Sequence, residues 1–132
     1  KEKINNVHFL GSFTQEYVYE IYKKSKALYV SLKDSEVLNL TLPYKVQSYL
    51  SAGKLIIGSV SGITKKLIIN NKLGYCCKNN DLKKLQEIIL KVYFLKNAER
   101  KEFERNSLNY FKNNFVFKNN IKKLSRILNA ET

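Results

Sequence analysis

Short apolar runs alternate along this chain with longer segments in which apolar residues recur at every third or fourth position. Short runs are typical of buried strands, and the longer periodic segments are typical of helices that place one face on a core. We expect strands at residues 7–10, 27–32, 54–59 and 75–77. We expect helices at residues 14–26, 43–53, 63–70 and 81–95, followed by two more between 98 and 127.

This alternation of strands and helices predicts the fold class. Parallel neighbours in a sheet need a crossover of about a dozen residues, and the intervening helices supply it. We therefore expect an α/β domain with a parallel sheet, helices on both faces and right-handed connections. The last two helices form a helical C-terminal extension, with their joint at Asn113-Asn114 or Asn119-Asn120. Residues 1–132 contain no internal repeat and no Gly/Ser linker, so a single domain is expected.

Individual residues mark the ends of the expected helices. Thr14 and Asp81 have side chains that can cap a helix N-terminus. Pro43 suits a first position, where its missing N–H costs nothing, and Gly53 suits a left-handed C-terminal turn. The residues expected to face the core on the helices that begin at Thr14 and Asp81 are Tyr17, Val18, Ile21, Tyr22, Leu82, Leu85, Ile88, Ile89 and Val92.

The carboxyl ends of the expected strands indicate where a ligand would bind, because open parallel sheets bind ligands at that edge. These ends are residues 11–13, 31–41 and 59–62. The loop at 33–41 is the longest of them, and loops on a rigid scaffold are where function concentrates.

Lys45 lies in the first turn of the helix that Pro43 begins. A helix N-terminus has free N–H groups and a partial positive charge, so it attracts phosphate. A cation at this end opposes the helix dipole unless an anion is bound, which makes Lys45 a candidate phosphate ligand. The alternative is a lysine that extends into solvent and binds nothing.

The charge balance of the chain favours an anionic partner. Its 132 residues include 24 Lys and Arg against 11 Asp and Glu, for a net charge of +13. Nucleotide phosphates, nucleic acid and an anionic membrane face all fit such a charge, although a compositional bias of the source would also explain it. Paired lysines at 65–66, 83–84 and 122–123 would attract a membrane if they share a side, and otherwise are solvated helix faces.

Signals for membrane spanning, secretion and metal binding are missing from the sequence. No apolar run approaches the roughly 20 residues of a membrane span, and neither a signal-peptide pattern nor an initiator Met opens the chain. We therefore expect an excised part of a longer cytoplasmic protein. Cys76 and Cys77 are adjacent, which disfavours a disulfide, and together with His8 they are too few for a metal site. No metal and no cofactor are expected.

Residues 41–59, TLPYKVQSYLSAGKLIIGS, resemble the nucleotide-sugar-binding half of GT-B glycosyltransferases of the large retaining family 4. They are most similar to the branch that builds bacterial surface polysaccharides, with its pattern P-S-K-V-Q-S-Y-L-A-x-G-K-P-I. The flanks agree, because residues 7–11, 29–32 and 74–81 resemble the family's V-x-F-L-G, v-v-P-S and G-…-D segments. The resemblance covers about residues 7–128. It implies a Rossmann-like C-terminal half of a GT-B fold that lacks its first strand and the N-terminal acceptor domain.

The resemblance also implies which residues bind the donor. The base would lie by Gly11, Ser12 and Phe13, and Ser59 and Gly62 would line the same crevice. The diphosphate would meet the loop and helix start formed by Thr41, Leu42, Pro43, Tyr44 and Lys45.

One family motif is altered in this sequence. The family has a glutamate, seven residues and a second glutamate, which by register from Gly53 fall at Leu40 and Ser48. The Ser48 hydroxyl would hydrogen-bond a ribose hydroxyl, more weakly than a carboxylate would. Asp34 and Glu36 are candidate substitutes for the first carboxylate, with surface loop residues as the alternative. The catalytic residues stay unknown.

The function that the resemblance implies is sugar transfer from a nucleoside-diphosphate sugar, with uridine as the usual base, in bacterial polysaccharide biosynthesis. The acceptor would be a glycan or lipid-linked molecule bound through the missing N-terminal domain, with peripheral contact to the inner membrane face. Transfer would retain configuration and need no metal, and the fragment alone would be inactive.

The alternative function is a basic nucleic-acid-binding module without catalysis. No basic-aromatic motif gathers on one element, so no nucleic acid partner is expected. A response-regulator-like domain would need a phospho-accepting Asp at the end of a central strand, and Val30-Ser31-Leu32 supplies none.

Overall fold

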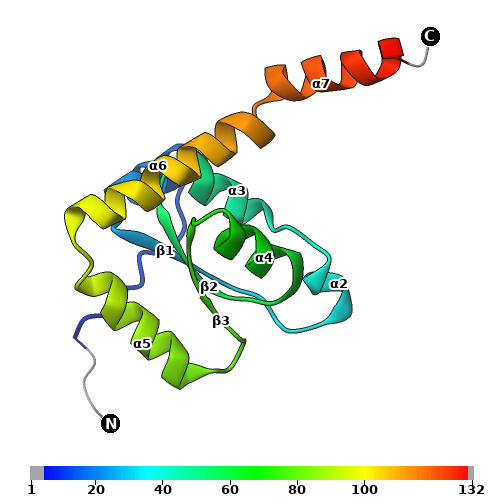
Figure 1. Cartoon of the computed structure of the whole chain (residues 1–132). Helices are drawn as coiled ribbons and strands as arrows, with labels where there is room; N and C mark the ends of the chain where they lie inside the picture. The colour runs from blue at the N-terminus through cyan, green and yellow to red at the C-terminus, as the bar shows by residue number, and fades with distance from the viewer. Residues whose placement is uncertain (1–4, 131–132) are drawn as a thin grey trace.

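The computed structural model describes residues 5–130, and Figure 1 traces their path. The elements in chain order are α1 (Gln15–Lys24), β1 (Ala27–Ser31), α2 (Glu36–Asn39), α3 (Tyr44–Ser51), β2 (Leu55–Ser59), α4 (Gly62–Asn70), β3 (Gly74–Cys77), α5 (Leu82–Tyr93), α6 (Asn97–Asn114) and α7 (Phe117–Ala130).

The three strands form one parallel sheet in the order β1-β2-β3. The register aligns Tyr29 with Ile57, and Ile57 with Tyr75. All of β2 is buried, because it has a strand on each side and helices on each face. The expected α/β class, with a parallel sheet flanked by helices and a helical extension at the C-terminus, is confirmed.

Apolar side chains form one cluster on each face of the sheet. The larger cluster joins β1 and β2 to α3 and α4, and Leu50 and Ile56 are fully buried within it. The smaller cluster joins the other face of β2, through Leu55, to Ile88 of α5. Phe103 of α6 packs on this second cluster, whereas the C-terminal part of the same helix packs on the first. α6 therefore ties the two faces together.

The end of α3 turns the chain directly into β2. The Gly53 N–H donates to the Leu50 carbonyl at 3.0 Å, and the Lys54 N–H donates to the Tyr49 carbonyl at 3.3 Å. These two bonds form a Schellman motif, which needs a left-handed residue just past the helix. Gly53 has a φ of +65°, so the expected glycine end of this helix is confirmed. α4 ends in the same bonding pattern, but there Lys72 takes the left-handed position with a φ of 51°.

The expected strand at residues 7–10 is wrong. This segment is irregular, Phe9 is 98% exposed, and Val7 and Leu10 are each more than half exposed. A strand needs a neighbour that accepts its backbone hydrogen bonds, and no strand of the described sheet lies beside this segment. A short apolar run in the sequence does not show whether a neighbouring strand is present. The described sheet therefore begins at β1.

Three smaller expectations also change. The loop at 33–41 contains α2, whose N-cap Ser35 accepts a hydrogen bond from the Leu38 N–H at 3.3 Å. Thr14 precedes α1, but its side chain makes no capping bond. On α5, Leu82 and Ile89 are exposed, because this helix rests mainly on β2 and β3 and buries a narrow stripe.

The joint of the last two helices lies at Phe115-Val116, immediately after the first of the two expected positions, Asn113-Asn114, which itself still belongs to α6. In Figure 1, α7 extends beyond the end of α6 and away from the sheet. Within residues 5–130, none of the helices is both long enough and apolar enough to cross a bilayer.

Candidate functional site

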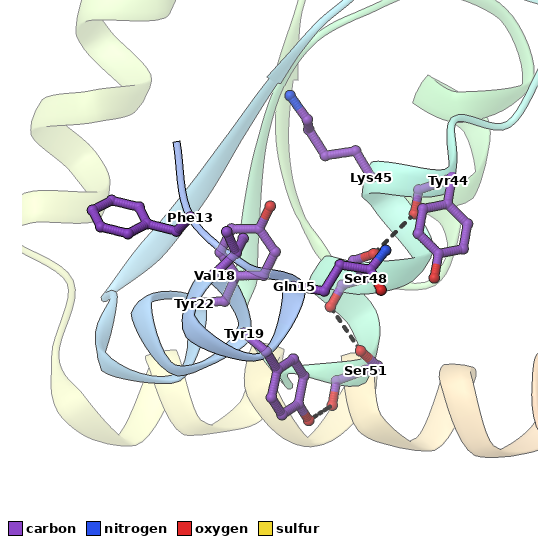
Figure 2. Close-up of a pocket in the computed structure, with 9 residues that line it drawn as sticks. All are labelled: Phe13, Gln15, Val18, Tyr19, Tyr22, Tyr44, Lys45, Ser48 and Ser51. Atoms are coloured by element: carbon purple, nitrogen blue, oxygen red, sulfur yellow. Dashed lines mark hydrogen bonds between the residues drawn. The ribbon is translucent and has the colours of Figure 1, made fainter. Parts of the chain in front are cut away.

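A cleft of about 370 Å³ lies between α1 and α3 (Figure 2). This volume falls within the range of small-molecule sites, roughly 300–1,000 Å³. The residues that line it are Phe13, Gln15, Val18, Tyr19, Tyr22, Tyr44, Lys45, Ser48 and Ser51. The lining therefore combines aromatic rings and hydroxyl groups with one full positive charge and no carboxylate.

Both helices of the cleft begin at the carboxyl edge of the sheet. α1 leads into β1 through residues 25–26, and α3 leads into β2 through residues 52–54. With connections this short, each helix runs antiparallel to the strand that follows it. Phe13, Tyr44 and Lys45 therefore lie at the edge where the strands end, and open parallel sheets bind ligands at this edge.

Tyrosine side chains hold α1 against α3. The Tyr19 hydroxyl donates to the Ser51 carbonyl at 3.1 Å, and the Tyr22 ring meets the Tyr49 ring edge-on with centroids 5.0 Å apart. The Tyr49 hydroxyl donates in turn to the Tyr29 carbonyl of β1 at 2.9 Å. Burial raises the pKa of Tyr49 to about 12, because a buried phenolate would lose its hydration. The phenol thus stays protonated at neutral pH and keeps donating this bond.

The N-terminus of α3 has no acidic group to balance it. Pro43 is the N-cap residue, no side chain caps the helix, and its first turn contains no Asp or Glu. Lys45 adds a full charge there, and no carboxylate of the described chain forms an ion pair with it. In Figure 2 the Lys45 side chain extends from the end of the cleft at which α3 begins. The first-turn N–H groups and the Lys45 ammonium therefore make this end of the cleft complementary to an anion.

Ser48 lies one helical turn after Tyr44 on the same face of α3. Its hydroxyl donates to the Tyr44 carbonyl at 3.3 Å (Figure 2). The oxygen of that hydroxyl keeps its capacity to accept a hydrogen bond from a ligand. A serine here supplies a polar contact to the cleft without a negative charge.

Phe13 lines the cleft from the segment that enters α1. Its ring is 44% exposed and lies 4.6 Å from the ring of Tyr17, centroid to centroid. Tyr17 is itself more than half exposed, so the expectation that it faces the core is wrong. It supports Phe13 instead. An aromatic ring that is held on one side and open on the other suits stacking against a flat apolar group.

Five of the expected donor-binding residues lie near the cleft but outside its lining. One of them is Pro43, which is the N-cap residue of α3. Gly11 and Ser12 are in the exposed segment before α1. The Thr41 hydroxyl donates to the Val37 carbonyl at 2.7 Å, and Leu42 packs against the larger apolar cluster. Thr41 and Leu42 therefore hold the loop in place.

Ser59 and Gly62 are also outside the lining, and each has a structural role. Ser59 is buried at the end of β2, and its hydroxyl donates to the Lys78 carbonyl at 3.3 Å. Gly62 begins α4 with a φ of +60°, and a Cβ at this position would overlap the Asn39 carbonyl oxygen. Only a glycine allows α2 to approach α4 this closely.

Sequence reasoning missed five residues of the cleft. Val18 and Tyr22 were expected only to pack on the core, and the other three, Gln15, Tyr19 and Ser51, were not singled out. Gln15, Val18, Tyr19 and Tyr22 follow the spacing of one helical face, so this face was visible in the sequence. The sequence could not show whether this face packs on the core or borders a cleft. In the structure it borders the cleft, and no residue of α1 is buried.

The two candidate carboxylates, Asp34 and Glu36, lie outside the cleft. Asp34 accepts a hydrogen bond from the Asn39 side chain at 2.8 Å, and Glu36 is exposed on α2. Neither belongs to the lining. Within residues 5–130, no three His, Cys, Asp or Glu side chains gather in a way that could hold a metal ion.

Residues 1–110 match the family model described as glycosyl transferases group 1. This stretch covers most of the chain and includes both helices of the cleft. No curated protein and no solved structure matches the chain.

Proposed function

Because this chain belongs to the group 1 glycosyl transferases, we propose that the cleft between α1 and α3 binds the nucleoside-diphosphate sugar that donates the transferred sugar. The observation that carries this proposal is the combination of Lys45, unpaired with any described carboxylate, and the uncapped N-terminus of α3. A cation and a helix N-terminus at the same point repel each other weakly, and a bound diphosphate removes that repulsion.

The diphosphate contacts the first turn of α3. The free backbone N–H groups of this turn point out of the helix end, and the Lys45 ammonium would supply a second kind of donor to the same anion. As the bond to the sugar breaks, negative charge grows on the leaving diphosphate. Hydrogen-bond donors that are already in place stabilise that charge and so lower the barrier to sugar transfer.

The nucleoside lies along the rest of the cleft. Phe13 offers a ring face to the base, and the Ser48 oxygen accepts from a ribose hydroxyl. The absence of a carboxylate from the lining favours an anionic ligand over a cationic one. We propose a uridine nucleotide as the donor and a glycan or lipid-linked acceptor of bacterial polysaccharide biosynthesis, held by a separate acceptor domain. We further propose that transfer retains configuration and uses no metal.

Binding of diphosphates to the 132-residue chain tests the donor site. Saturation-transfer NMR with UDP, GDP and ADP should show binding of UDP above the other two. Lys45→Gln should weaken UDP binding by about 1.5–3 kcal/mol, or about 10- to 150-fold, because one charged hydrogen bond is lost. Lys66→Gln is the matched control, since Lys66 is exposed on α4 and does not line the cleft.

Two outcomes would count against the proposal. Equal UDP affinity in the wild type and in Lys45→Gln would remove Lys45 from the phosphate site. Binding of a single-stranded oligonucleotide alone, lost steeply as salt is raised, would instead favour the basic nucleic-acid-binding module.

A further inference from the structure

A second groove, of about 520 Å³, lies between the end of α4 and the C-terminal half of α6, and its lining is mainly asparagine. Six of its eight lining residues are Asn70, Asn71, Asn106, Asn109, Asn113 and Asn114, and the other two are Lys72 and Tyr110. The chain has 15 asparagines among its 132 residues, so eight residues of average composition would include about one. The composition of the chain therefore does not explain this gathering of amides.

This amide groove lies at the edge of the sheet opposite the donor cleft. Lys72 comes shortly before β3, which begins at Gly74. On α6, the hydroxyl of the buried Ser107 donates at 3.0 Å to the carbonyl of Lys54, directly before β2. The groove is therefore beside the amino ends of the strands, whereas the donor cleft is at their carboxyl ends. A ligand in one of these sites leaves the other free.

Backbone carbonyl groups hold three of the amides in place. The Asn106 side chain donates to the Lys72 carbonyl at 3.1 Å, which ties α6 to the turn after α4. The side chains of Asn71 and Asn114 each donate at 2.9 Å to the carbonyl four residues earlier in the chain. Each of these bonds uses one amide hydrogen, so each side chain keeps a second N–H and its carbonyl oxygen for a ligand.

The other polar side chains of the amide groove are open. Within residues 5–130, the side chains of Asn70, Asn109 and Asn113 make no hydrogen bond. The Tyr110 hydroxyl makes none within this range either. Asn106, Tyr110 and Asn113 follow one another on α6 at steps of four and three, so they form one face about 10 Å long.

The chemistry of the lining decides which class of ligand fits. Among the described residues, the lining has no carboxylate, no aliphatic side chain and a single cation, Lys72, although 27% of the residues of the chain are charged. An anion would find one charge, and a peptide would find neither a sheet edge nor an apolar pocket for its side chains. Amides donate and accept hydrogen bonds at once, and so do the hydroxyl groups of a sugar.

Tyr110 adds an aromatic surface to the groove. Its side chain is half-buried, packs against the larger apolar cluster and lies 6.0 Å from the ring of Phe115, centroid to centroid. A ring fixed in this way can cover the C–H face of a sugar while the neighbouring amides pair with the hydroxyl groups. The combination of amides with one aromatic ring and little charge therefore suits a neutral carbohydrate.

We propose that the amide groove is a second carbohydrate site, which binds a neutral oligosaccharide apart from the donor cleft. Asn109 and Asn113 pair with its hydroxyl groups, and Tyr110 covers one sugar ring. The site holds part of a glycan chain while the chain's end is elsewhere on the protein. This use of the site rests on the proposed glycan acceptor, whereas the binding itself does not depend on the donor cleft.

Nitrogen–proton NMR spectra of the 132-residue chain test this directly, because each asparagine side chain gives its own pair of signals. The probes are three neutral tetrasaccharides: chitotetraose, cellotetraose and maltotetraose. We expect weak binding, since amide–hydroxyl bonds replace amide–water bonds at a small net gain, so each probe is titrated to about 10 mM. At least one should shift the Asn109 and Asn113 side-chain signals to saturation. No saturable shift with any of the three would overturn the proposal.

Paired substitutions assign the binding to the amide groove. Asn109→Ala with Asn113→Ala should raise the dissociation constant at least about tenfold, measured on backbone signals of the groove, because two hydrogen-bonding side chains are lost. Asn5→Ala with Asn6→Ala is the matched control, since it removes the same groups from exposed positions outside the groove and should change the constant less than about twofold. Equal affinity in the wild type and in the groove variant would overturn the proposal.

The groove variant should stay folded. Asn109 and Asn113 are exposed on α6, and alanine favours a helix more than asparagine does. Its melting temperature should therefore equal or exceed that of the wild type, and lost binding then reports the groove alone.

Two competitors separate this site from the alternatives. Saturating UDP should leave oligosaccharide binding unchanged, because the donor cleft lies at the other edge of the sheet. Loss of oligosaccharide binding with UDP would place the sugar in the donor cleft and overturn the proposal. If inorganic phosphate shifts the groove signals and no oligosaccharide does, an anion site at Lys72 replaces the carbohydrate site. Failure of UDP to bind would count against the donor site and leave this test unaffected.

Discussion

Replacing Gly53 with alanine should destabilise the protein by about 2–4 kcal/mol. Its φ of +65° lies in the left-handed region, which costs a residue with a side chain about 1–2 kcal/mol. The new Cβ would also lie 2.7 Å from Cγ of Leu108 and 3.0 Å from each of its Cδ atoms. Overpacking costs typically about 1–3 kcal/mol, and we expect the lower half of that range because Leu108 is 37% exposed and has room to move.

Urea denaturation followed by tyrosine fluorescence and circular dichroism measures this effect, since the chain has nine Tyr and no Trp. In a Leu108→Ala background the alanine at position 53 should cost only about 1–2 kcal/mol, because the contact is gone and the backbone strain stays. Gly11→Ala is the matched control. Gly11 has a φ of +80° but no atom within 4 Å of its Cβ position, and it lies in an exposed segment. Its substitution should cost no more than the backbone strain alone, about 1–2 kcal/mol, because the new Cβ meets no other atom.

The reasoning fails if Gly53→Ala costs less than about 0.5 kcal/mol, because the turn from α3 into β2 would then relax without strain. An equal cost of Gly53→Ala with and without the Leu108 side chain would show that the backbone alone is responsible. Either result would mean that α3, and with it Lys45, is held less firmly than the Schellman motif suggests.

Two further predictions use the same denaturation assay. Lys72→Gly should stabilise the protein by about 1 kcal/mol, because Lys72 takes the left-handed position after α4 at a φ of 51°. An unchanged free energy of unfolding would show that the lysine is unstrained there. The free energy of unfolding should fall between about pH 10 and pH 12. Burial raises the pKa of Tyr49 to about 12 from the usual value near 10. The stabilising contribution of Tyr49 is therefore full below pH 10 and is lost as the phenol ionises in the folded state. The comparison is made in a Cys76→Ala background, because burial also raises the pKa of Cys76 to about 12. In that background Tyr49→Phe should reduce the loss of stability between pH 10 and pH 12. An unchanged loss would rule Tyr49 out as its cause.

Much of the secondary structure followed from local patterns in the sequence. β1, β2, β3 and six of the helices, all but α2, fall within a few residues of the segments expected from apolar spacing. Asp81 caps α5 by accepting from the Lys84 N–H at 3.0 Å, as its position before an apolar periodic segment indicated. These features depend on neighbours within one helical turn, and such neighbours are visible in any single sequence.

The candidate site was only partly predictable. Phe13, Tyr44, Lys45 and Ser48 all line the cleft, whereas Ser59 and Gly62 hold the scaffold together. The sequence marked Phe13, Ser59 and Gly62 as residues at strand ends, and Tyr44, Lys45 and Ser48 as residues of the helix that follows the longest strand-end loop. Whether such a residue lines a cleft depends on which way its side chain points and what covers it, and both are set by elements distant in the sequence.

The sequence by itself determined where helices begin and end, the parallel α/β class, the cationic start of α3 and the basic, amphipathic character of α7. Capping, periodicity and charge are properties of short segments, so they need no tertiary contact. Only the tertiary structure decided that residues 7–10 are not a strand, that α1 borders a cleft, and that α7 stands uncovered. A strand, a cleft and an uncovered face are each defined by what lies beside them, and packing between distant segments supplies or withholds that neighbour.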